Sequence, residues 1–115
     1  PFGVFESKIF SYKKQKIEEK KYTKWFDYDK IKDSPCVRTR RQGDYLTVNS
    51  EGGRKKLNRI FIDEKIPAEM RDRLPVVAAG SEILWIPGGR MNEKYKITST
   101  TGRVLELHYQ GGALA

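Results

Sequence analysis

The sequence predicts a small α+β domain, in which a layered, sandwich-like β-structure packs beside one or two short helices. Its length of 115 residues fits one ordinary domain. Two apolar runs, residues 75–79 and 83–87, have the length of buried strands. The third observation is a change of period, because Leu57, Ile60 and Phe61 recur at the i, i+3, i+4 spacing of one helix face.

The first half of the chain predicts short extended segments joined by turns and one connector. Residues 3–12 mix apolar and polar positions and are typical of a strand or hairpin, whereas residues 13–21 are highly charged and predict an exposed connector. The aromatic segment 25–31 predicts a short strand and turn that dock onto a core. Residues 36–41 and 45–48 predict a pair of extended segments around a turn.

The second half predicts two helices followed by strands. The first helix, around Leu57, buries one face and presents Lys55, Lys56 and Arg59 on the opposite side. The second helix covers residues 67–74, since proline suits a first helical turn and a further proline ends the segment. Strands are predicted over residues 76–79, 82–86, 95–99 and 104–109.

The highly charged connector over residues 13–21 predicts a subdomain boundary, and the chain is divided after residue 23. Residues 1–23, a strand or hairpin plus the charged connector, are interpreted as the tail of a preceding domain. Residues 24–115 then form a domain of their own. The chain opens at Pro1 with no initiator methionine, so we expect a piece of a longer protein.

The charge is strongly asymmetric. The chain carries 23 Lys and Arg against 15 Asp and Glu, a formal net charge of +8. Residues 1–60 hold 16 of the cations and 8 of the acids, whereas residues 61–115 hold 7 of each. The whole excess therefore lies in the first half and predicts a polyanionic partner there. The alternative is that these lysines and arginines only solvate the surface.

Several classes of protein are excluded by the sequence. No apolar run approaches the length of a membrane helix, so we expect no membrane partner. The single cysteine, Cys36, rules out an internal disulfide. No secretory pattern of basic start, apolar stretch and cleavage site is present. Together these features predict a cytoplasmic protein.

The sequence offers no catalytic site. One histidine, His108, and one cysteine cannot supply the ligands of a zinc site. There is no Gly-x-x-x-x-Gly-Lys-Ser/Thr phosphate loop and no Gly-x-Gly-x-x-Gly after a strand. We therefore expect no catalytic residues, no metal and no cofactor in this chain.

What remains is an ordered basic constellation. Arg38 and Arg40 alternate along a predicted strand and would share one face. Asp44, after the turn, is placed to hold an arginine through a bidentate contact. Gly52 and Gly53 precede the predicted helix, whose N–H groups would attract phosphate. The candidate nucleic-acid contacts are Arg38, Arg40, Arg41, Arg54, Lys55, Lys56 and Arg59.

Two alternatives stay open for this constellation. Arg38 and Asp44 would also make a purely structural salt bridge, and Lys55 and Lys56 would also suit the solvated face of a helix. No basic-aromatic platform is evident in the sequence, which disfavours stacking on single strands. An RNA partner would therefore be recognised through the backbone and shape of a duplex.

The order of motifs resembles the C-terminal domain of bacterial tRNA(Ile)-lysidine synthetase over residues 24–109. The motifs are Arg-Thr-Arg-Arg-x-Gly-Asp at 38–44, Gly-x-Lys-Lys-Leu at 53–57, Phe-Ile-Asp-Glu-Lys-Ile-Pro at 61–67, Arg-Asp-Arg-Leu-Pro at 71–75 and Ile-Leu-Trp-Ile-Pro-Gly at 83–88. The resemblance implies a small layered β-structure with helices, similar to a domain of the phenylalanyl-tRNA synthetase β subunit. It also implies that this domain grips the body and acceptor stem of a tRNA.

The same resemblance implies a parent enzyme. That family uses ATP to activate the wobble cytidine of an isoleucine tRNA with a CAU anticodon, and free lysine then attacks. A catalytic N-terminal domain of the same chain, with its own phosphate loop, performs this chemistry, so this fragment should be inactive alone. A homodimer is left open. The alternative role is a module that orients the catalytic domain through apolar contacts at Phe2, Phe5, Trp25 and Trp85, without touching RNA.

Overall fold

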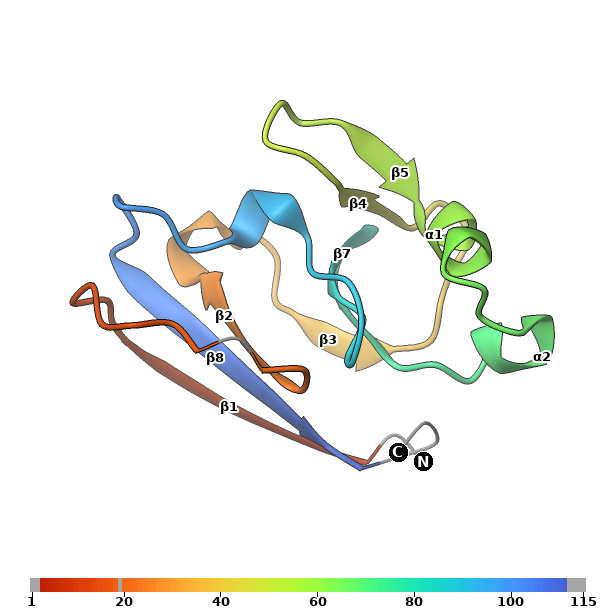
Figure 1. Cartoon of the computed structure of the whole chain (residues 1–115), viewed down its shortest axis with the longest axis horizontal. Coiled ribbons are helices and arrows are strands. Elements are labelled where there is room, and N and C mark those ends of the chain that lie inside the picture. Colours follow the sequence, from red (N-terminus) through yellow and green to blue (C-terminus); the bar gives the residue numbers. More distant parts are fainter. Residues whose placement is uncertain (1–2, 19, 112–115) are drawn as a thin grey trace.

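The computed structural model describes residues 3–18 and 20–111 and contains two β-sheets. The first sheet has three strands in the order β1-β8-β2, and the second has five in the order β3-β6-β7-β4-β5. Two short helices lie beside the second sheet (Figure 1). The predicted α+β class with a layered β-structure is therefore confirmed.

The first sheet joins the two ends of the described chain. Strands β1 (Val4–Ser11) and β2 (Thr23–Asp27) pair antiparallel with opposite edges of β8 (Arg103–Gln110). β1 pairs along its whole length, from Val4 opposite Gln110 to Ser11 opposite Arg103. The segment 3–12, predicted as a strand or hairpin, thus contains one strand of this sheet, Val4–Ser11. The division at residue 23 stays a prediction about the longer chain.

The second sheet is built on a central hairpin. Strands β6 (Val76–Ala79) and β7 (Glu82–Trp85) are buried at every residue, as their continuous apolar sequence predicts for strands covered on both faces. β3 (Cys36–Arg38) pairs with β6, while β4 (Tyr45–Thr47) joins β7 in parallel. β5 (Arg54–Lys56) completes the far edge.

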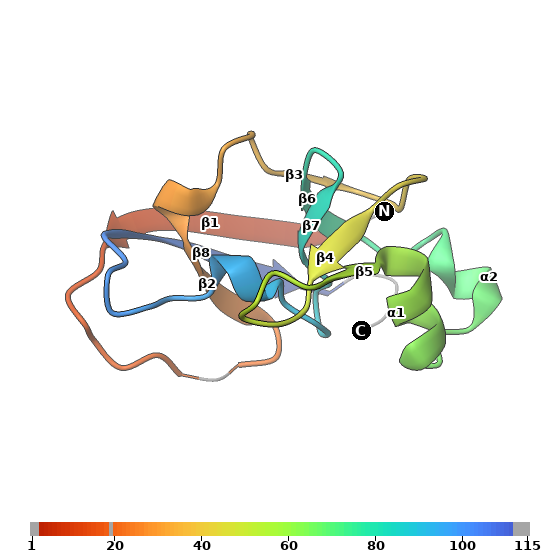
Figure 2. The ribbon, with the colours of Figure 1, turned by 90° about the horizontal axis from the view of Figure 1, so that it is seen from above.

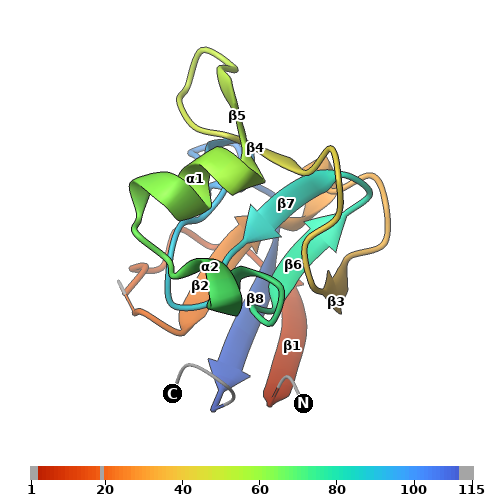
Figure 3. The ribbon, with the colours of Figure 1, turned by 90° about the vertical axis from the view of Figure 1, so that its right-hand side faces the viewer.

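The helices cover the face of the second sheet that is turned away from the first. α1 (Leu57–Asp63) buries Leu57, Ile60 and Phe61, so the helix face predicted from their spacing is confirmed. α2 (Ala68–Arg71) follows, with Pro67 as its N-cap. Figure 3 shows both helices together beside β7. Two single-turn 3-10 helices, η1 (Tyr28–Lys30) and η2 (Glu93–Tyr95), lie in the connections.

Two apolar clusters lie on the two faces of the second sheet. The cluster facing the first sheet includes Phe26, Trp85 and Leu105, and the cluster facing α1 includes Leu46 and Ile83. The second sheet is therefore the middle layer between the first sheet and the helices. Because each layer holds the next by apolar burial, the loops at the edges of the second sheet are fixed in position.

The strand predicted over residues 95–99 is wrong. Tyr95 is the last residue of η2, and residues 96–99 continue as a bend and a turn, because buried polar groups determine the path of the chain. Tyr95 donates from Oη to Oε1 of the buried Glu82 at 2.5 Å, and the amide of Asn92 donates to the Ile83 carbonyl at 2.8 Å. The Asn92 side chain also accepts from the Lys94 N–H. Satisfying these groups stabilises the turn over an extended strand.

Candidate nucleic-acid interface

Arg38 and Asp44 form a buried bidentate pair. The Arg38 Nη1 and Nη2 atoms each donate to one Asp44 carboxylate oxygen at 2.8 Å, and the arginine is only 9% exposed. Nη1 and Nη2 also donate to the carbonyls of Thr39 and Gly80. Asp44 raises the pKa of Arg38 further above its usual value through these bonds. The structural salt bridge, left open by the sequence, is confirmed.

Arg38 is therefore misplaced among the predicted phosphate contacts. Its guanidinium is enclosed by protein acceptors and does not reach the surface. Arg40 does not share its face either, because β3 ends at Arg38 and the chain leaves the sheet. The alternation that predicted a common face applies only within a strand.

Arg40 and Arg41 lie in the loop between β3 and β4. Arg40 is 26% exposed at its side chain and donates from Nε to Asp72 at 2.8 Å and from Nη1 to Asn58 at 2.9 Å. The backbone N–H of Arg41 donates to Asp44 at 2.7 Å, while its side chain is exposed. Together with Gln42 these residues line an open cavity of about 320 Å³.

The glycine pair does not lead into a helix. Gly52 and Gly53 belong to the turn of the β4–β5 hairpin, where Asn49 Oδ1 accepts from the N–H groups of Glu51 and Gly53. Strand β5 lies between this turn and α1, so Arg54, Lys55 and Lys56 are strand residues. The N–H of Leu57 already donates to the Asp44 carbonyl at 2.9 Å. The prediction that the glycine pair directly precedes the helix is therefore wrong.

Strand alternation divides the basic residues of β5 between two faces. Arg54 and Lys56 are exposed on one face, whereas Lys55 is half-buried on the other. Lys55 Nζ lies 2.5 Å from Asp63 Oδ2, and Arg59 Nε lies 3.2 Å from Asp63 Oδ1. The hydrogen bond from Lys55, with the nearby charge of Arg59, holds the pKa of Asp63 below its usual value. One carboxylate thus partly neutralises two of the predicted contacts.

The structure also contains a basic-aromatic contact that sequence reasoning missed. The Arg54 guanidinium lies 4.5 Å from the centre of the Tyr45 ring, a cation–π distance. Tyr45 pairs with Lys56, so all three side chains share the exposed face of the hairpin. The contact is diagonal between two strands, and only knowledge of the register would have revealed it.

Hydrogen bonds link the segments that carry the remaining candidates, although Lys55 lies on the opposite face of β5 from Arg54 and Lys56. Asp44 links the Arg40–Arg41 loop to the start of α1, and Arg40 bonds Asn58 on that helix. Figure 2 shows β5 running directly into α1. Arg90, not predicted from the sequence, donates to the Val48 carbonyl and so joins the same hairpin. The surface defined by Arg40, Arg41, Arg54, Lys55, Lys56 and Arg59 is called the basic surface below.

The fold is that of a small two-sheet α+β domain that exposes basic side chains in the β3–β4 loop, on β5 and on α1. Among the described residues, no helix is long and apolar enough to cross a membrane. Residues 36–107 match the family model of the TilS substrate C-terminal domain. The chain belongs to that family.

Relatives agree with this assignment. The tRNA(Ile)-lysidine synthase of Caldanaerobacter subterraneus subsp. tengcongensis is 50% identical over 76% of this chain and 19% of the relative. That of Clostridium tetani is 41% identical over 78% of this chain and 19% of the relative. A crystal structure of a TilS C-terminal domain matches with a TM-score of 0.75 and 32% identity, covering 95% of this chain and 84% of that one. The chain thus spans about a fifth of the length of these two curated relatives.

Proposed function

We propose that this chain is the tRNA-binding C-terminal domain of a tRNA(Ile)-lysidine synthase. The names of the relatives support the parent enzyme, and the basic surface supports the role in binding. In this proposal a catalytic part elsewhere in the longer protein uses ATP to join lysine to the wobble cytidine. This domain holds the tRNA body for it. The use of ATP, the cytoplasmic location and the formation of a homodimer remain predictions about the longer protein.

The observation that carries the proposal is that three segments linked by hydrogen bonds each expose a basic side chain. The β3–β4 loop contributes Arg41, β5 contributes Arg54 and Lys56, and α1 contributes Arg59, all exposed. Within residues 3–18 and 20–111, no carboxylate pairs with Arg41 or Lys56. Cations without protein partners are available for phosphates, and each contact releases counterions from the RNA.

A salt titration tests this proposal. The chain is titrated with a short RNA hairpin at several salt concentrations, and the slope of log affinity against log salt is measured. Replacing two contacts, in the double variant Arg41→Gln/Lys56→Gln, should reduce the slope by about 2, since each duplex phosphate contact contributes about 0.9. Affinity should fall most at low salt.

The matched control removes the same charge elsewhere. Lys8 on β1 and Lys32 after η1 are both exposed and lie outside the basic surface. The double variant Lys8→Gln/Lys32→Gln should leave the slope close to that of the unaltered chain. Equal slopes for all three proteins would show that the basic surface does not contact RNA.

An apolar groove favours a second candidate function, the packing module. A cavity of about 330 Å³ between the first sheet and β3 is lined by residues that include Phe5, Ile9 and Val37. Of the contacts predicted for this role, Trp85 is wrong because it is fully buried, and Phe2 lies outside the described residues. If the RNA affinity does not depend on salt, or if no RNA binds in the titration, the packing role is the better-supported function of this domain.

A further inference from the structure

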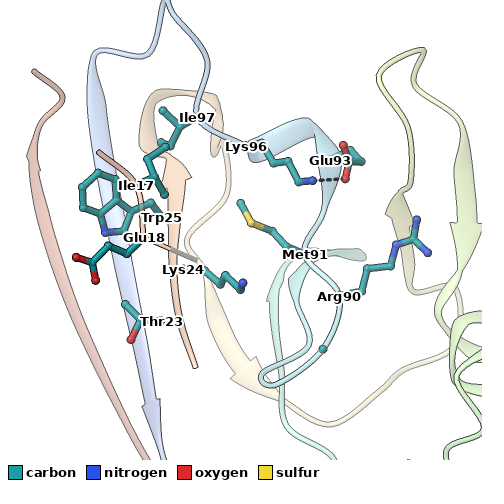
Figure 4. A pocket seen from close by; sticks show the side chains of 11 residues that line it. Ile17, Glu18, Thr23, Lys24, Trp25, Arg90, Met91, Glu93, Lys96 and Ile97 are labelled. Carbon is teal, nitrogen blue, oxygen red and sulfur yellow. Dashed lines mark ion pairs between the residues drawn. The ribbon is translucent and has the colours of Figure 1, made fainter. Parts of the chain in front are cut away.

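A second cavity, of about 360 Å³, lies along the edge of β2 (Figure 4). Three segments line it: the connector before β2, β2 itself and residues 89–97. Figure 4 shows Met91 near the centre of this lining, with Trp25, Ile17 and Ile97 on one side and Arg90 on the other. Its volume lies in the range of small-ligand sites. None of the residues that define the basic surface lines this cavity.

The cavity wall combines an aromatic ring with a thioether. Trp25 is held in place by a hydrogen bond from Nε1 to Glu106 at 2.9 Å and by an edge-on contact with Phe10 at 5.0 Å between ring centres. Met91 is half-buried and adaptable in shape. A fixed indole beside a flexible sulfur side chain suits a flat aromatic ligand.

The edge of β2 adds main-chain hydrogen-bonding groups. Tyr109 donates its N–H to the Tyr22 carbonyl at 2.9 Å, and hydrogen-bonded pairs alternate along an antiparallel ladder. Thr23 and Trp25 therefore turn their N–H and C=O groups away from β8. Both residues line the cavity, whereas no residue of β8 lines it in the described part of the chain. The N–H and C=O groups that point away from β8 therefore face the cavity. Adjacent donors and acceptors of this kind match the edge of an unpaired base.

Three cations and two carboxylates, Glu18 and Glu93, are among the residues that line the cavity. Lys24, Arg90 and Lys96 line it, with Lys96 held by Glu93 at 2.6 Å. Arg90 donates to the Val48 carbonyl of the hairpin that carries Arg54 and Lys56. The cavity and the basic surface are thus linked through Arg90 and the β4–β5 hairpin.

We propose that this cavity takes one unpaired nucleotide of an RNA whose helical stem lies on the basic surface. The base would pack on Trp25 and Met91 and meet the main-chain edge of β2, and its phosphate would lie near Arg90. A paired nucleotide does not fit this description, because its hydrogen-bonding edge is occupied. This inference rests on the proposed function and adds recognition of unpaired RNA to it.

The test compares three RNA hairpins with the same stem. One is blunt, one carries a 3′ single-stranded extension containing each of the four bases once, and one carries the same extension at the 5′ end. Binding to the whole chain is measured by anisotropy. At least one extended hairpin should bind on the order of tenfold tighter than the blunt one, the range expected for stacking one base.

The methionines provide an independent readout. Met91 lines the cavity, whereas Met70 lies in α2 beside the other helix. With labelled ε-methyl groups, the Met91 resonance should shift with the extended hairpin and not with the blunt one, and Met70 should serve as the reference. Met91→Ala should remove the advantage of the extension, and the control Met70→Ala should keep it.

The outcomes separate this inference from the proposed function. If the blunt hairpin binds with the expected salt slope, but the extensions add no affinity and Met91 does not shift, the cavity proposal is overturned and the basic surface stands. If no hairpin binds, the proposed function fails and the cavity proposal falls with it.

Discussion

The Arg38 guanidinium and the Asp44 carboxylate meet through two parallel hydrogen bonds of 2.8 Å in the interior. The same Asp44 accepts the N–H of Arg41 through its side chain and the N–H of Leu57 through its carbonyl. One aspartate thus joins β3, the β3–β4 loop and α1. The basic surface depends on this junction, although Arg38 is not part of it.

Removing the guanidinium should destabilise the fold. Arg38→Met leaves the Asp44 carboxylate buried without its main partner, and we expect the free energy of unfolding to fall by about 3–5 kcal/mol. Urea unfolding at neutral pH measures this. The control is Arg40→Met, which breaks an exposed pair with Asp72 and should cost about 1 kcal/mol or less. Similar losses for both variants would contradict the structural role of the buried pair.

Neutralising Asp63 should strengthen RNA binding. Asp63 holds both Lys55 and Arg59, so Asp63→Asn frees two cations of the basic surface. We expect affinity for an RNA hairpin to rise about 2- to 5-fold at low salt, the size of an exposed ionic interaction. The gain should shrink as salt increases.

A matched aspartate controls for net charge. Asp29 forms a comparable exposed pair with Arg103, which lowers the pKa of its carboxyl as Lys55 does for Asp63. It lies in η1, the orange turn beside β2 and away from α1 in Figure 1. Asp29→Asn should leave RNA affinity nearly unchanged. An equal gain from both variants would mean that net charge alone, and not the position of the basic surface, controls binding.

Tyr95 should make stability depend on alkaline pH. Burial, and then the hydrogen bond to Glu82, raises the pKa of its phenol in the folded protein. The folded state therefore holds this proton more tightly than the unfolded chain. The resulting stability is complete below about pH 10 and is lost as pH rises further, by up to about 1.4 kcal/mol per pH unit.

The variant Tyr95→Phe isolates this effect. At neutral pH it should lower the free energy of unfolding by about 1–3 kcal/mol, because the buried Glu82 loses a donor. Above about pH 10 its stability should fall less steeply than that of the unaltered chain, so the two curves converge. Urea unfolding across this range supplies both curves. Parallel curves would show that Tyr95 does not titrate differently in the folded state.

Asn49 should control the order of the β4–β5 hairpin. Its Oδ1 accepts from Glu51 and Gly53 at 3.0 and 2.9 Å, so Asn49→Ala removes two turn hydrogen bonds. We expect a loss of about 1–2 kcal/mol, and faster hydrogen exchange at Val48, which bonds the Gly53 carbonyl. Exchange at Val77, in the central strands, should change only as far as global stability does. Unchanged exchange at Val48 would contradict the role of the side chain.

Much of the fold could be predicted from local pattern. The spacing of Leu57, Ile60 and Phe61 predicts the buried face of α1, and the apolar runs predict β6 and β7, because each pattern reports a face that must be buried. The segment 95–99 could not be predicted this way. Its path depends on Glu82, a residue distant in sequence whose buried carboxylate recruits Asn92 and Tyr95.

The residue types of the candidate site could be predicted from the sequence, but their spatial arrangement could not. Its residue types and order led to the family, and Arg41, Arg54, Lys56 and Arg59 are exposed as expected. Arg38 differs because β3 ends at that residue and Asp44 encloses its guanidinium. The contact of Arg54 with Tyr45, and the hydrogen bond of Arg90 to Val48, need strand register and chain reversal, which local spacing does not encode.

Local sequence patterns establish the class of this protein: a basic α+β domain with its charge excess before residue 61 and with a motif order that identifies its family. Charge and periodicity are local quantities, so they can be read without a structure. The three-dimensional structure was needed to establish which cations reach the surface, which are held by carboxylates, and where a cavity opens. Those outcomes depend on contacts between residues far apart in the chain, because such contacts determine which charges are buried and which are paired.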